Sequence, residues 1–488
     1  MRSRVSAEAE RSVGNVRTWR LYLTLLLLGA LVGCGGPGKR VAVPPPAPVF
    51  FGAVVSPERL AGEVARQVLA DGGDAADAAV ALGFALAVSL PSRAGLGGGG
   101  ACLAYEPAPA GPGRGRPEAI LFLPKAPAGG AVGDRPAAVP MLARGLYLLH
   151  ARYGRLPIRQ LVGEAQKMAR LGIPVSAPLA QDLSAVAGPL LADPAARAVF
   201  AGPSGAPLAA GQTLFQPELA NTLSELRLNG VGDFYQGPLA RRLAAAASVA
   251  GGGLAEQDFT RAVPAIGTPI ELRAGVNSVA FLPPPADGGL AAAAAFADLW
   301  RSPQDLAGAA GRALAIAARW RAGGVTAEQL LGTKTLVPAS LPPLPASAAF
   351  AALDSAGGAV ACAVTMNNLF GTGRIAPGTG VLLAAAPGTE PLPLLSAGIA
   401  WNNNIHAFRA AVAGSGQNAA AIAVGLTMAD TLRSRTLVPV AVPPPGVAQM
   451  IACGHFLPGN AASCGAAADP PGAGFALISR YGGRAGGS

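Results

Sequence analysis

The segment from Gly72 to Tyr105 constrains the fold most, because it joins a helix that is apolar on nearly every side to a run of glycines. Asp74 can cap a helix over "AADAAVALGFALAVSLPS", and a helix that is apolar on nearly every side is expected to be buried. The glycine run at 97–100 then leads into the strand-like "ACLAY", where glycine permits close backbone approach at a cleft. A phosphate-binding loop is not expected, because no Lys-Ser or Lys-Thr follows the glycines and no strand precedes them.

The remaining chain divides into a helical part and a later part rich in strands. Residues 144–183 have a helical pattern that is broken at "RYGRLP" and "LGIPVS", and residues 233–264 predict a helix pair around the glycines at 251–253. From about residue 343, short apolar strands such as "AFAALD" and "AVACAVTM" flank the turn Gly357-Gly358. Helices followed by strand pairs favour layered sheets flanked by helices.

Composition indicates a globular protein and excludes some function classes. Hydrophobic residues make up 51% and charged residues 13% of the 488 residues, which suits a large core. The net charge of +10 is scattered, without a basic cluster interleaved with aromatics, so nucleic-acid binding is not expected. The three histidines have no Cys or acidic partners at ligand spacing, so no metal and no cofactor is expected.

The N-terminus predicts export. Arg17 and Arg20 precede the apolar run "LYLTLLLLGALVG", which is too short to span a bilayer comfortably and fits a signal peptide over residues 1–33. Its end, Leu31-Val32-Gly33-Cys34, resembles a bacterial lipobox, which implies a lipid anchor on Cys34; the alternative is a plain signal peptide with an incidental cysteine. Gly35 implies outer-membrane sorting, on the periplasmic face of the cell envelope. The Pro-rich stretch within residues 34–50 predicts a stiff tether.

The other four cysteines fall into two kinds. Cys453 and Cys464 flank a Gly/Pro/Asn turn, so a local disulfide is expected in an oxidising compartment. Cys102 and Cys362 lie in apolar strand-like runs, and we expect both to be inert core residues.

Five blocks in order resemble the gamma-glutamyltransferase (gamma-glutamyltranspeptidase) family of the N-terminal-nucleophile hydrolase superfamily. They are "GGDAADAAVALGFALAVSLPSRAGLGGGG", "ARYGRLPIRQLVGEAQKMARLGIPVS", "FYQGPLARRL", "GGGLAEQDF" and "LDSAGGAVACAVTMNNLFGTGRIAPGTGVLL". The resemblance implies an α/β fold, a four-layer αββα sandwich. It also implies that residues 51–346 correspond to the large subunit and residues 347–488 to the small subunit of a self-cleaved precursor.

The resemblance also implies a nucleophile. The family cuts itself before a threonine in T-T-H-x-S-V-V-D, and the new N-terminal amine then serves as the base. Seven residues before Asp354 stands Ser347, in "SAAFAALD", so cleavage is expected between Ala346 and Ser347. A serine keeps the hydroxyl that this chemistry needs.

Other site residues follow from the same resemblance. The family's T-x-N corresponds to "TMN", which gives Thr365 as support for the nucleophile and Asn367 as a substrate ligand. Its P-L-S-S-M-S-P-T corresponds to "PLLSAGIA" and leaves Ser396, while its G-S-P-G-G oxyanion turn corresponds to "GSGQN", with Gly416 and Gln417. The expected partner is a small amide or peptide substrate, besides the two fragments of the chain itself.

Several positions depart from the family pattern. The family arginine that binds the substrate's α-carboxylate falls at Leu123, with Lys125 two residues on, and the acidic motif is reduced to Glu390. An apolar or uncharged acyl group is therefore expected in a pocket with Leu123, Leu395 and Asn367. Two hypotheses remain: an active amidase or acyltransferase, or a degenerate, lipid-anchored homologue that binds or scaffolds, in which Ser347 is an ordinary loop serine.

Overall fold

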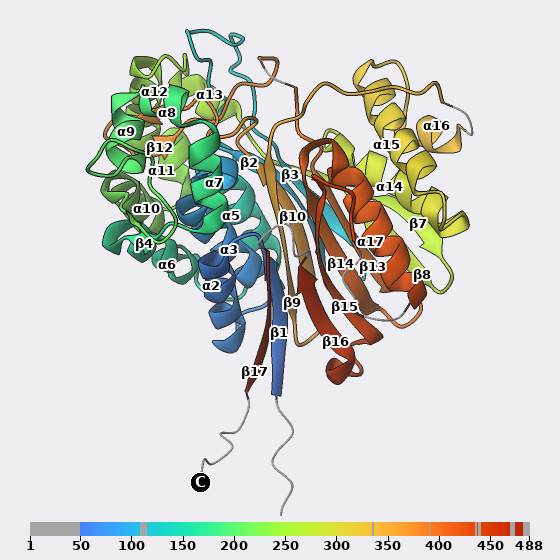
Figure 1. The fold of residues 1–488 in the computed structure, drawn as a ribbon. Coiled ribbons are helices and arrows are strands. Elements are labelled where there is room, and N and C mark those ends of the chain that lie inside the picture. The colour runs from blue at the N-terminus through green and yellow to red at the C-terminus, as the bar shows by residue number, and fades with distance from the viewer. Residues whose placement is uncertain are drawn as a thin grey trace, which may run out of the picture. The chain divides into compact units, whose positions relative to one another are not determined.

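Two β-sheets lie face to face, and each is covered on its outer side by helices (Figure 1). The computed structural model describes residues 49–107, 115–333, 336–389, 391–434, 437, 441–468 and 474–481. Residues Pro48–Gly482 form one compact unit. The order of layers, helix, sheet, sheet and helix, confirms the predicted four-layer αββα sandwich.

The first sheet contains both strands of the predicted hairpin. Its seven strands run in the order β17-β1-β9-β10-β2-β3-β6, and all neighbours are antiparallel. The strands are β1 (Val49–Ser56), β2 (Gly99–Tyr105), β3 (Glu118–Phe122), β6 (Ala265–Gly267), β9 (Ser347–Asp354), β10 (Ala359–Thr365) and β17 (Phe475–Tyr481).

The second sheet draws mostly on the C-terminal part of the chain. Its six strands run in the order β16-β15-β14-β13-β8-β7. They are β7 (Ile270–Ala274), β8 (Asn277–Phe281), β13 (Ser396–Asn402), β14 (Ala407–Ser415), β15 (Val447–Leu457) and β16 (Cys464–Ala468). Two short pairs lie outside these sheets: β4 (Ile173–Pro174) with β5 (Thr213–Leu214), and β11 (Ile375–Ala376) with β12 (Val381–Leu382).

The helices on the first sheet's side come from residues 59–261. They are α2 (Arg59–Ala70), α3 (Ala75–Ser89), α4 (Pro91–Ala94), α5 (Leu142–Tyr153), α6 (Ile158–Leu171), α7 (Ala177–Ala185), α8 (Ala187–Leu191), α9 (Pro194–Phe200), α10 (Pro217–Asn229), α11 (Val231–Gln236), α12 (Pro238–Val249) and α13 (Glu256–Arg261). Those on the second sheet's side are α14 (Asp287–Arg301), α15 (Leu306–Arg321), α16 (Ala327–Gly332) and α17 (Ala420–Ser434), with the short 3-10 helices η1 (Gln417–Ala419) and η2 (Ala461–Ser463) elsewhere.

α3 is the apolar helix that the sequence predicts, and all of its residues are buried. Asp74 caps it as expected: the Asp74 carboxylate accepts the N–H of Asp77, while the Asp77 carboxylate accepts the N–H of Asp74. The helix packs against β9 and β10 on one side and against α2, α5 and α6 on the others. A helix without a polar face is stable here because none of its sides meets water.

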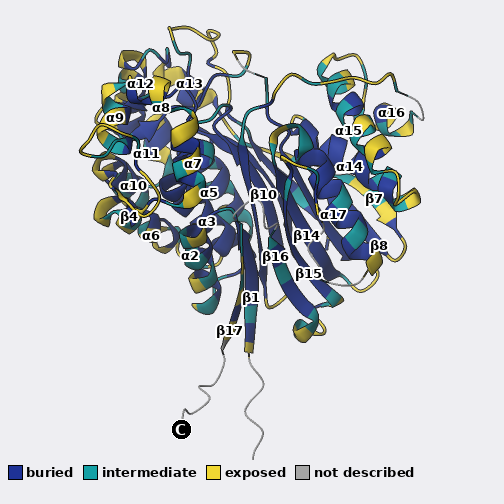
Figure 2. Ribbon diagram, viewed as in Figure 1, coloured by how far each residue is buried: buried dark blue, intermediate teal, exposed yellow. Residues whose placement is uncertain are grey.

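β9 is a central strand whose two faces are both covered, one by the second sheet and one by helices. All eight of its residues are buried, in contrast with the exposed outer faces of the helices (Figure 2). Ala351 and Leu353 pack between the two sheets, whereas Phe350 and Ala352 pack against the helices. The alternation is the two-residue period of a strand, and it places Ser347 on the side that faces the second sheet.

Candidate active site

Ser347 is the first residue of β9 and lies at one end of the layer between the two sheets. It is 2% exposed. The sequence left open that Ser347 is an ordinary loop serine, but the structure places it in a buried strand of the central sheet. A nucleophile held in this way by a regular element has a fixed position relative to its neighbours.

Thr365 is hydrogen-bonded to the peptide bond that precedes Ser347. It ends β10 and lies directly opposite Ser347 in the antiparallel register. Its Oγ1 donates a hydrogen bond to the carbonyl oxygen of Ala346 (3.1 Å) and accepts one from the backbone N–H of Asn367 (2.9 Å). The structure thus brings together Ser347 and Thr365, with the threonine hydroxyl on the carbonyl whose carbon Ser347 would attack.

A cavity of about 540 Å³ opens beside Ser347. Ala346 and Ser347 contribute to its wall from the first sheet, and Ser415, Val447 and Gln449 from the strand ends of the second sheet. Leu90, Leu369 and Val442, with Pro57, Pro178, Pro444 and Pro445, make much of the remaining wall apolar. The volume is in the range of cavities that hold small organic ligands.

Gly416 and Gln417 also line this cavity, at the turn between β14 and η1. Both have positive φ values, 105° for Gly416 and 53° for Gln417. A Cβ on Gly416 would lie 2.1 Å from the carbonyl oxygen of Pro445, so only glycine fits this position. The first N–H groups of a helix have no acceptor within it, so this turn can present N–H groups to a developing oxyanion.

Two of the residues predicted to bind substrate lie elsewhere. Asn367 is 2% exposed, and its Nδ2 donates to the carbonyl oxygen of Ala385 (3.0 Å) rather than lining the cavity. Ser396 lies on the opposite face of the second sheet, where its Oγ donates to the Leu394 carbonyl oxygen (3.4 Å). A Cβ on Gly288, in the first turn of α14, would be 2.6 Å from that Oγ, which places Ser396 under the helix layer.

The expected pocket with Leu123, Leu395 and Asn367 does not match this cavity, because none of the three lines it. Leu395 is fully buried in the layer between the sheets, and Leu123 packs against the same layer. Lys125, two residues after Leu123, donates from Nζ to the carbonyl oxygen of Val263 (2.6 Å) at an exposed position. None of these residues contributes a charge to the Ser347 cavity.

The cavity does contain an ion pair that the sequence did not indicate. Arg93 of α4 donates from Nε and Nη2 to the two carboxylate oxygens of Asp182 of α7 (2.8 and 2.6 Å). Ser92 adds a third hydrogen bond to Asp182 (2.7 Å), and Asp182 is 4% exposed against 30% for Arg93. The pair places one charge of each sign in the wall, so the wall gains no net charge from it.

A second cavity, of about 350 Å³, shares Leu369 with the first. Its wall includes the loop from Asn368 to Gly373 and the exposed ion pair partner Asp134, which meets Arg374. Ser347, the predicted nucleophile, lines the larger of these two cavities and not this one.

Some expectations fall outside the described residues. They are the signal peptide at 1–33, the lipid anchor on Cys34, most of the tether at 34–50, and Glu390. Among the residues that the structure does describe, no helix is both long and apolar enough to cross a membrane. The same described residues contain no group of three or more His, Cys, Asp or Glu side chains that could hold a metal ion.

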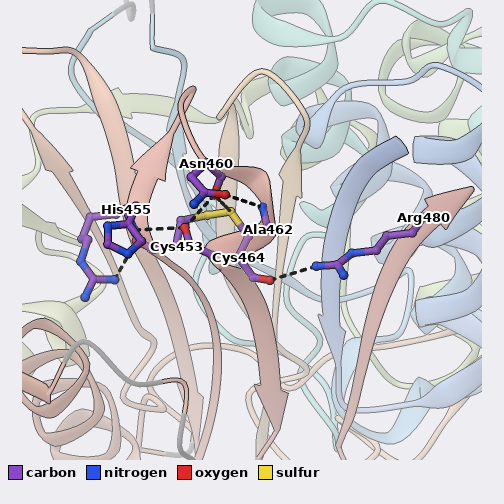
Figure 3. Close-up of a disulfide and its surroundings, with 8 residues drawn as sticks. Cys453, His455, Asn460, Ala462, Cys464 and Arg480 are labelled. Atoms are coloured by element: carbon purple, nitrogen blue, oxygen red, sulfur yellow. Dashed lines mark hydrogen bonds between the residues drawn. A yellow bond between two sulfur atoms is a disulfide. The ribbon is translucent and has the colours of Figure 1, made fainter. Parts of the chain in front are cut away.

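Two disulfides join neighbouring strands. Cys453 of β15 and Cys464 of β16 are opposite in register and linked, beside a turn in which Asn460 accepts the N–H of Ala462 (3.0 Å) (Figure 3). Cys102 of β2 and Cys362 of β10 are linked in the same way.

Cys102 and Cys362 are buried in the core as expected, but the sequence did not predict the disulfide between them. They are separated by 260 residues in sequence, and only the strand register brings them together. An apolar strand context predicts burial of a cysteine correctly, but burial does not determine whether a second cysteine lies opposite.

Comparisons with known proteins find sequence similarity over about half of the chain. The model of the family described as Gamma-glutamyltranspeptidase matches residues 61–299. The glutathione hydrolase proenzyme of Bacillus subtilis is 34% identical over 304 residues, which is 56% of this chain and 50% of that protein. The chain thus spans about half the length of the curated relatives it matches, and the family match ends before Ser347.

Solved structures extend the likeness in fold to almost the whole chain. The crystal structure of cephalosporin acylase from Bacillus halodurans has a TM-score of 0.70 and 19% identity, over 88% of this chain and 96% of that one. The gamma-glutamyltranspeptidase of Helicobacter pylori has a TM-score of 0.50 and 24% identity, over 59% of this chain and 92% of that one. At these identities the likeness establishes the fold.

Proposed function

We propose that the chain is a divergent relative of the gamma-glutamyltranspeptidase family and a self-cleaving amidase or acyltransferase with Ser347 as its N-terminal nucleophile. This proposal rests on one observation: a buried serine, a threonine hydroxyl and a cavity lie next to one another. Ser347 heads a buried strand, Thr365 holds the carbonyl of the preceding peptide, and a cavity of about 540 Å³ opens at Ser347 beside Gly416 and Gln417.

Self-cleavage would use the same hydroxyl as later turnover. Ser347 Oγ attacks the carbonyl carbon of Ala346, the C–N bond breaks, and the Ser347 nitrogen takes the proton as the acyl group moves to oxygen. Water then hydrolyses the resulting ester, which restores the hydroxyl and leaves a free Ser347 amine. The hydrogen bond from Thr365 would stabilise the negative charge that develops on the Ala346 oxygen during the attack.

In turnover the freed α-amine would act as the base. It removes the Oγ proton as the oxygen attacks the acyl carbonyl of an amide substrate, and it returns the proton to the leaving amine. The N–H groups at Gly416 and Gln417 would hold the oxyanion. Water, or a second amine, then takes the acyl group from Ser347, which gives hydrolysis or transfer.

The acyl group is proposed to be uncharged rather than glutamyl. Leu90, Leu369 and Val442 make the wall apolar, and the guanidinium of Arg93 is already engaged by Asp182. A glutamyl α-carboxylate would therefore enter without a free bidentate partner, and burying an unpaired charge costs several kcal/mol. Gamma-glutamyl anilides should be turned over far more slowly than neutral acyl anilides.

The decisive experiment is the mass of the purified full-length protein under denaturing conditions. The proposal expects two chains, of which the second begins at Ser347 and has the 142 residues that end at Ser488. Ser347→Ala should stay as one chain, and Ser347→Thr should cleave at least as fast, because the β-branched side chain restrains the rotamer. Wild-type protein that remains intact after long incubation would overturn the proposal.

We further propose that the protein is exported and anchored through a lipid on Cys34. Two disulfides support an oxidising compartment, since they are rare in the cytosol. Lipid labelling and membrane fractionation test the anchor: Cys34→Ser should lose both. Labelling that persists in that variant, or a mature N-terminus at another residue, would contradict it.

The second candidate is a degenerate homologue that binds or scaffolds without turnover. It is favoured by Ala348 and Ala349, which replace the threonine and histidine of the family motif, and by Leu123 in place of the arginine. The same mass measurement separates the two candidates, because a scaffold has no need of a cut before Ser347.

A further inference from the structure

Gln449 is an uncharged side chain that lies unpaired in the wall of the Ser347 cavity. It is 1% exposed, and neither its amide oxygen nor its amide nitrogen has a hydrogen-bond partner among the residues that the structure describes. Several other described side chains have one unpaired buried atom, but Gln449 is the one with two, and none of the others lines this cavity.

The strand register explains where the side chain points. Ile451 and Cys453, two and four residues further along β15, pack in the layer between the sheets, so Gln449 faces the same layer. Its neighbours across the strands are Ala413 of β14 and Ala468 of β16, which cannot pair with an amide. A Cβ on Gly474, just before β17 of the first sheet, would lie 3.4 Å from Nε2, so the side chain reaches across the layer.

An unpaired amide in an apolar layer destabilises the folded protein, because it has lost its bonds to water without gaining others. A methionine or leucine would fill the same space at no such cost. Orphaned polar groups of this kind point to a partner that is absent, and here the adjoining space is the cavity that Ser347 lines.

The chemistry of that partner follows from the chemistry of the side chain. A glutamine amide offers one acceptor and a pair of N–H donors with no charge, which is matched by another amide through two antiparallel hydrogen bonds. A carboxylate matches it poorly, because it has no donor for the Gln449 oxygen. Since both amide atoms are covered, the ligand pairs with them when the side chain turns toward the cavity.

We propose that Gln449 is a specificity-determining residue that binds an amide group carried on the acyl portion of the substrate. The substrate class is then an amide whose acyl chain bears a second, uncharged amide. This inference rests on the proposed function in assigning the cavity to the acyl group. It adds that the pocket is selective for a polar, uncharged acyl group over an apolar one.

Three anilides of equal chain length test the selectivity. They are the 4-nitroanilides of 4-carbamoylbutanoic acid, of 5-methylhexanoic acid, in which an isopropyl group replaces the amide, and of glutaric acid, in which a carboxylate does. Wild type should prefer the carbamoyl substrate in kcat/KM. In Gln449→Met the ratio of carbamoyl to methylhexanoyl turnover should fall at least about tenfold, since two hydrogen bonds are lost.

Two controls keep the test specific. Gln67→Met changes an exposed glutamine of α2 that bonds Asp71, and it should leave the substrate ratio unaltered. Gln449→Met should also raise Tm, because it replaces an unpaired amide with an apolar side chain of similar volume. A lower Tm with an unchanged ratio would mean that Gln449 is only structural, and a preference for the carboxylate substrate would point to Arg93; either result overturns the proposal.

Failure of the proposed function can be told apart from failure of this inference. If no anilide is turned over, NMR titration of Ser347→Ala with glutaramide measures binding alone, in a protein that cannot react. Binding that is lost in Ser347→Ala/Gln449→Met supports the amide site even without catalysis. Equal binding of glutaramide to both proteins, or turnover that does not depend on Gln449, overturns the inference.

Discussion

The two ends of β9 carry polar residues in opposite situations. Asp354, at the end of the strand, is 7% exposed and has three hydrogen-bond donors around its carboxylate. Ser347, at the start, faces a cavity in which the Gln449 amide has no hydrogen-bond partner among the described residues. We call the Asp354 end of β9 the complete end, because its carboxylate accepts three hydrogen bonds. We call the Ser347 end the open end, because the cavity there contains an amide without a hydrogen-bond partner among the described residues.

The complete end ties the hairpin to the apolar helix. One Asp354 oxygen accepts the backbone N–H groups of Ala356 and Gly358 (2.9 Å each), which closes the turn between β9 and β10. The other accepts the N–H of Ala75 (3.1 Å), in the first turn of α3. Burial raises the pKa of Asp354, although these hydrogen bonds oppose the shift.

The contrast between the two ends of β9 separates residues that stabilise the fold from residues that serve a function. Polar groups that are buried and fully paired hold elements together, whereas buried groups left unpaired beside a cavity imply a ligand. Changes at the Asp354 end should therefore affect folding with little effect on chemistry. Changes at the Ser347 end should do the reverse.

The largest expected effect is on stability, from Asp354→Ala. Three backbone N–H groups would lose a charged acceptor, which should lower the free energy of unfolding by about 3 kcal/mol. Urea denaturation measures the change in the free energy of unfolding. Asp305→Ala is the matched control, because Asp305 caps α15 with one exposed bond to Gly308 and should cost only about 1 kcal/mol.

This separation of the two ends would be wrong if Asp354→Ala slowed self-cleavage in molecules that are still folded. The rate of self-cleavage, measured well below the unfolding midpoint, should stay close to that of wild type. A loss of cleavage larger than the loss of folded protein would show that the two ends of β9 are coupled.

The next effect is a pH dependence of stability at Asp74, which lies near Asp354. Burial raises the pKa of Asp74 to about 7, and the nearby Asp77 and Asp354 carboxylates add to the shift while Arg155 opposes it. Because the folded pKa lies above the unfolded one, the proton stabilises the folded state. That stability is complete below about pH 4 and is lost as the pH rises through about 7.

Asp74→Asn should remove this pH dependence and keep the helix cap, since asparagine caps as well as aspartate. Between pH 4 and 7 the free energy of unfolding of wild type should fall relative to the variant, on the order of 2 kcal/mol. Chemical denaturation of both proteins across this range measures the difference. Parallel pH profiles would show that Asp74 stays charged, held by Arg155 (3.3 Å).

The sequence predicts the fold much better than it predicts the cavity. The apolar α3, its Asp74 cap and the hairpin around Gly357-Gly358 depend on local patterns, and the structure confirms all of them. The site residues next to Ser347 in strand register, such as Thr365, are also accessible to motif reasoning, because a hairpin fixes its own register.

The rest of the cavity depends on packing between distant segments. The Arg93–Asp182 pair joins residues 89 apart on two helices, and no local pattern marks either as a partner of the other. Gln449 looks like an ordinary strand residue until its neighbours are known to be alanines. Residues 123, 367, 395 and 396 align with positions in family motifs but lie outside the cavity, because motif order does not specify which face of a sheet a side chain meets.

Thr365→Val should have the smallest effect, a slower rate of self-cleavage. It is also the most direct test of whether the Ser347 end of β9 differs in role from the Asp354 end. The variant keeps the shape of the side chain but removes the hydroxyl that donates to the Ala346 carbonyl oxygen and accepts from the Asn367 N–H. Self-cleavage should slow about tenfold, the cost of one hydrogen bond that strengthens as charge develops on that oxygen. A time course on denaturing gels measures the rate, and Thr365→Ser, which retains the hydroxyl, should cleave within about threefold of wild type. If Val and Ser variants cleave equally fast while both are less stable than wild type, then Thr365 belongs with Asp354 among the residues that hold β9 in place, and the open end of the strand would contain no group that assists Ser347.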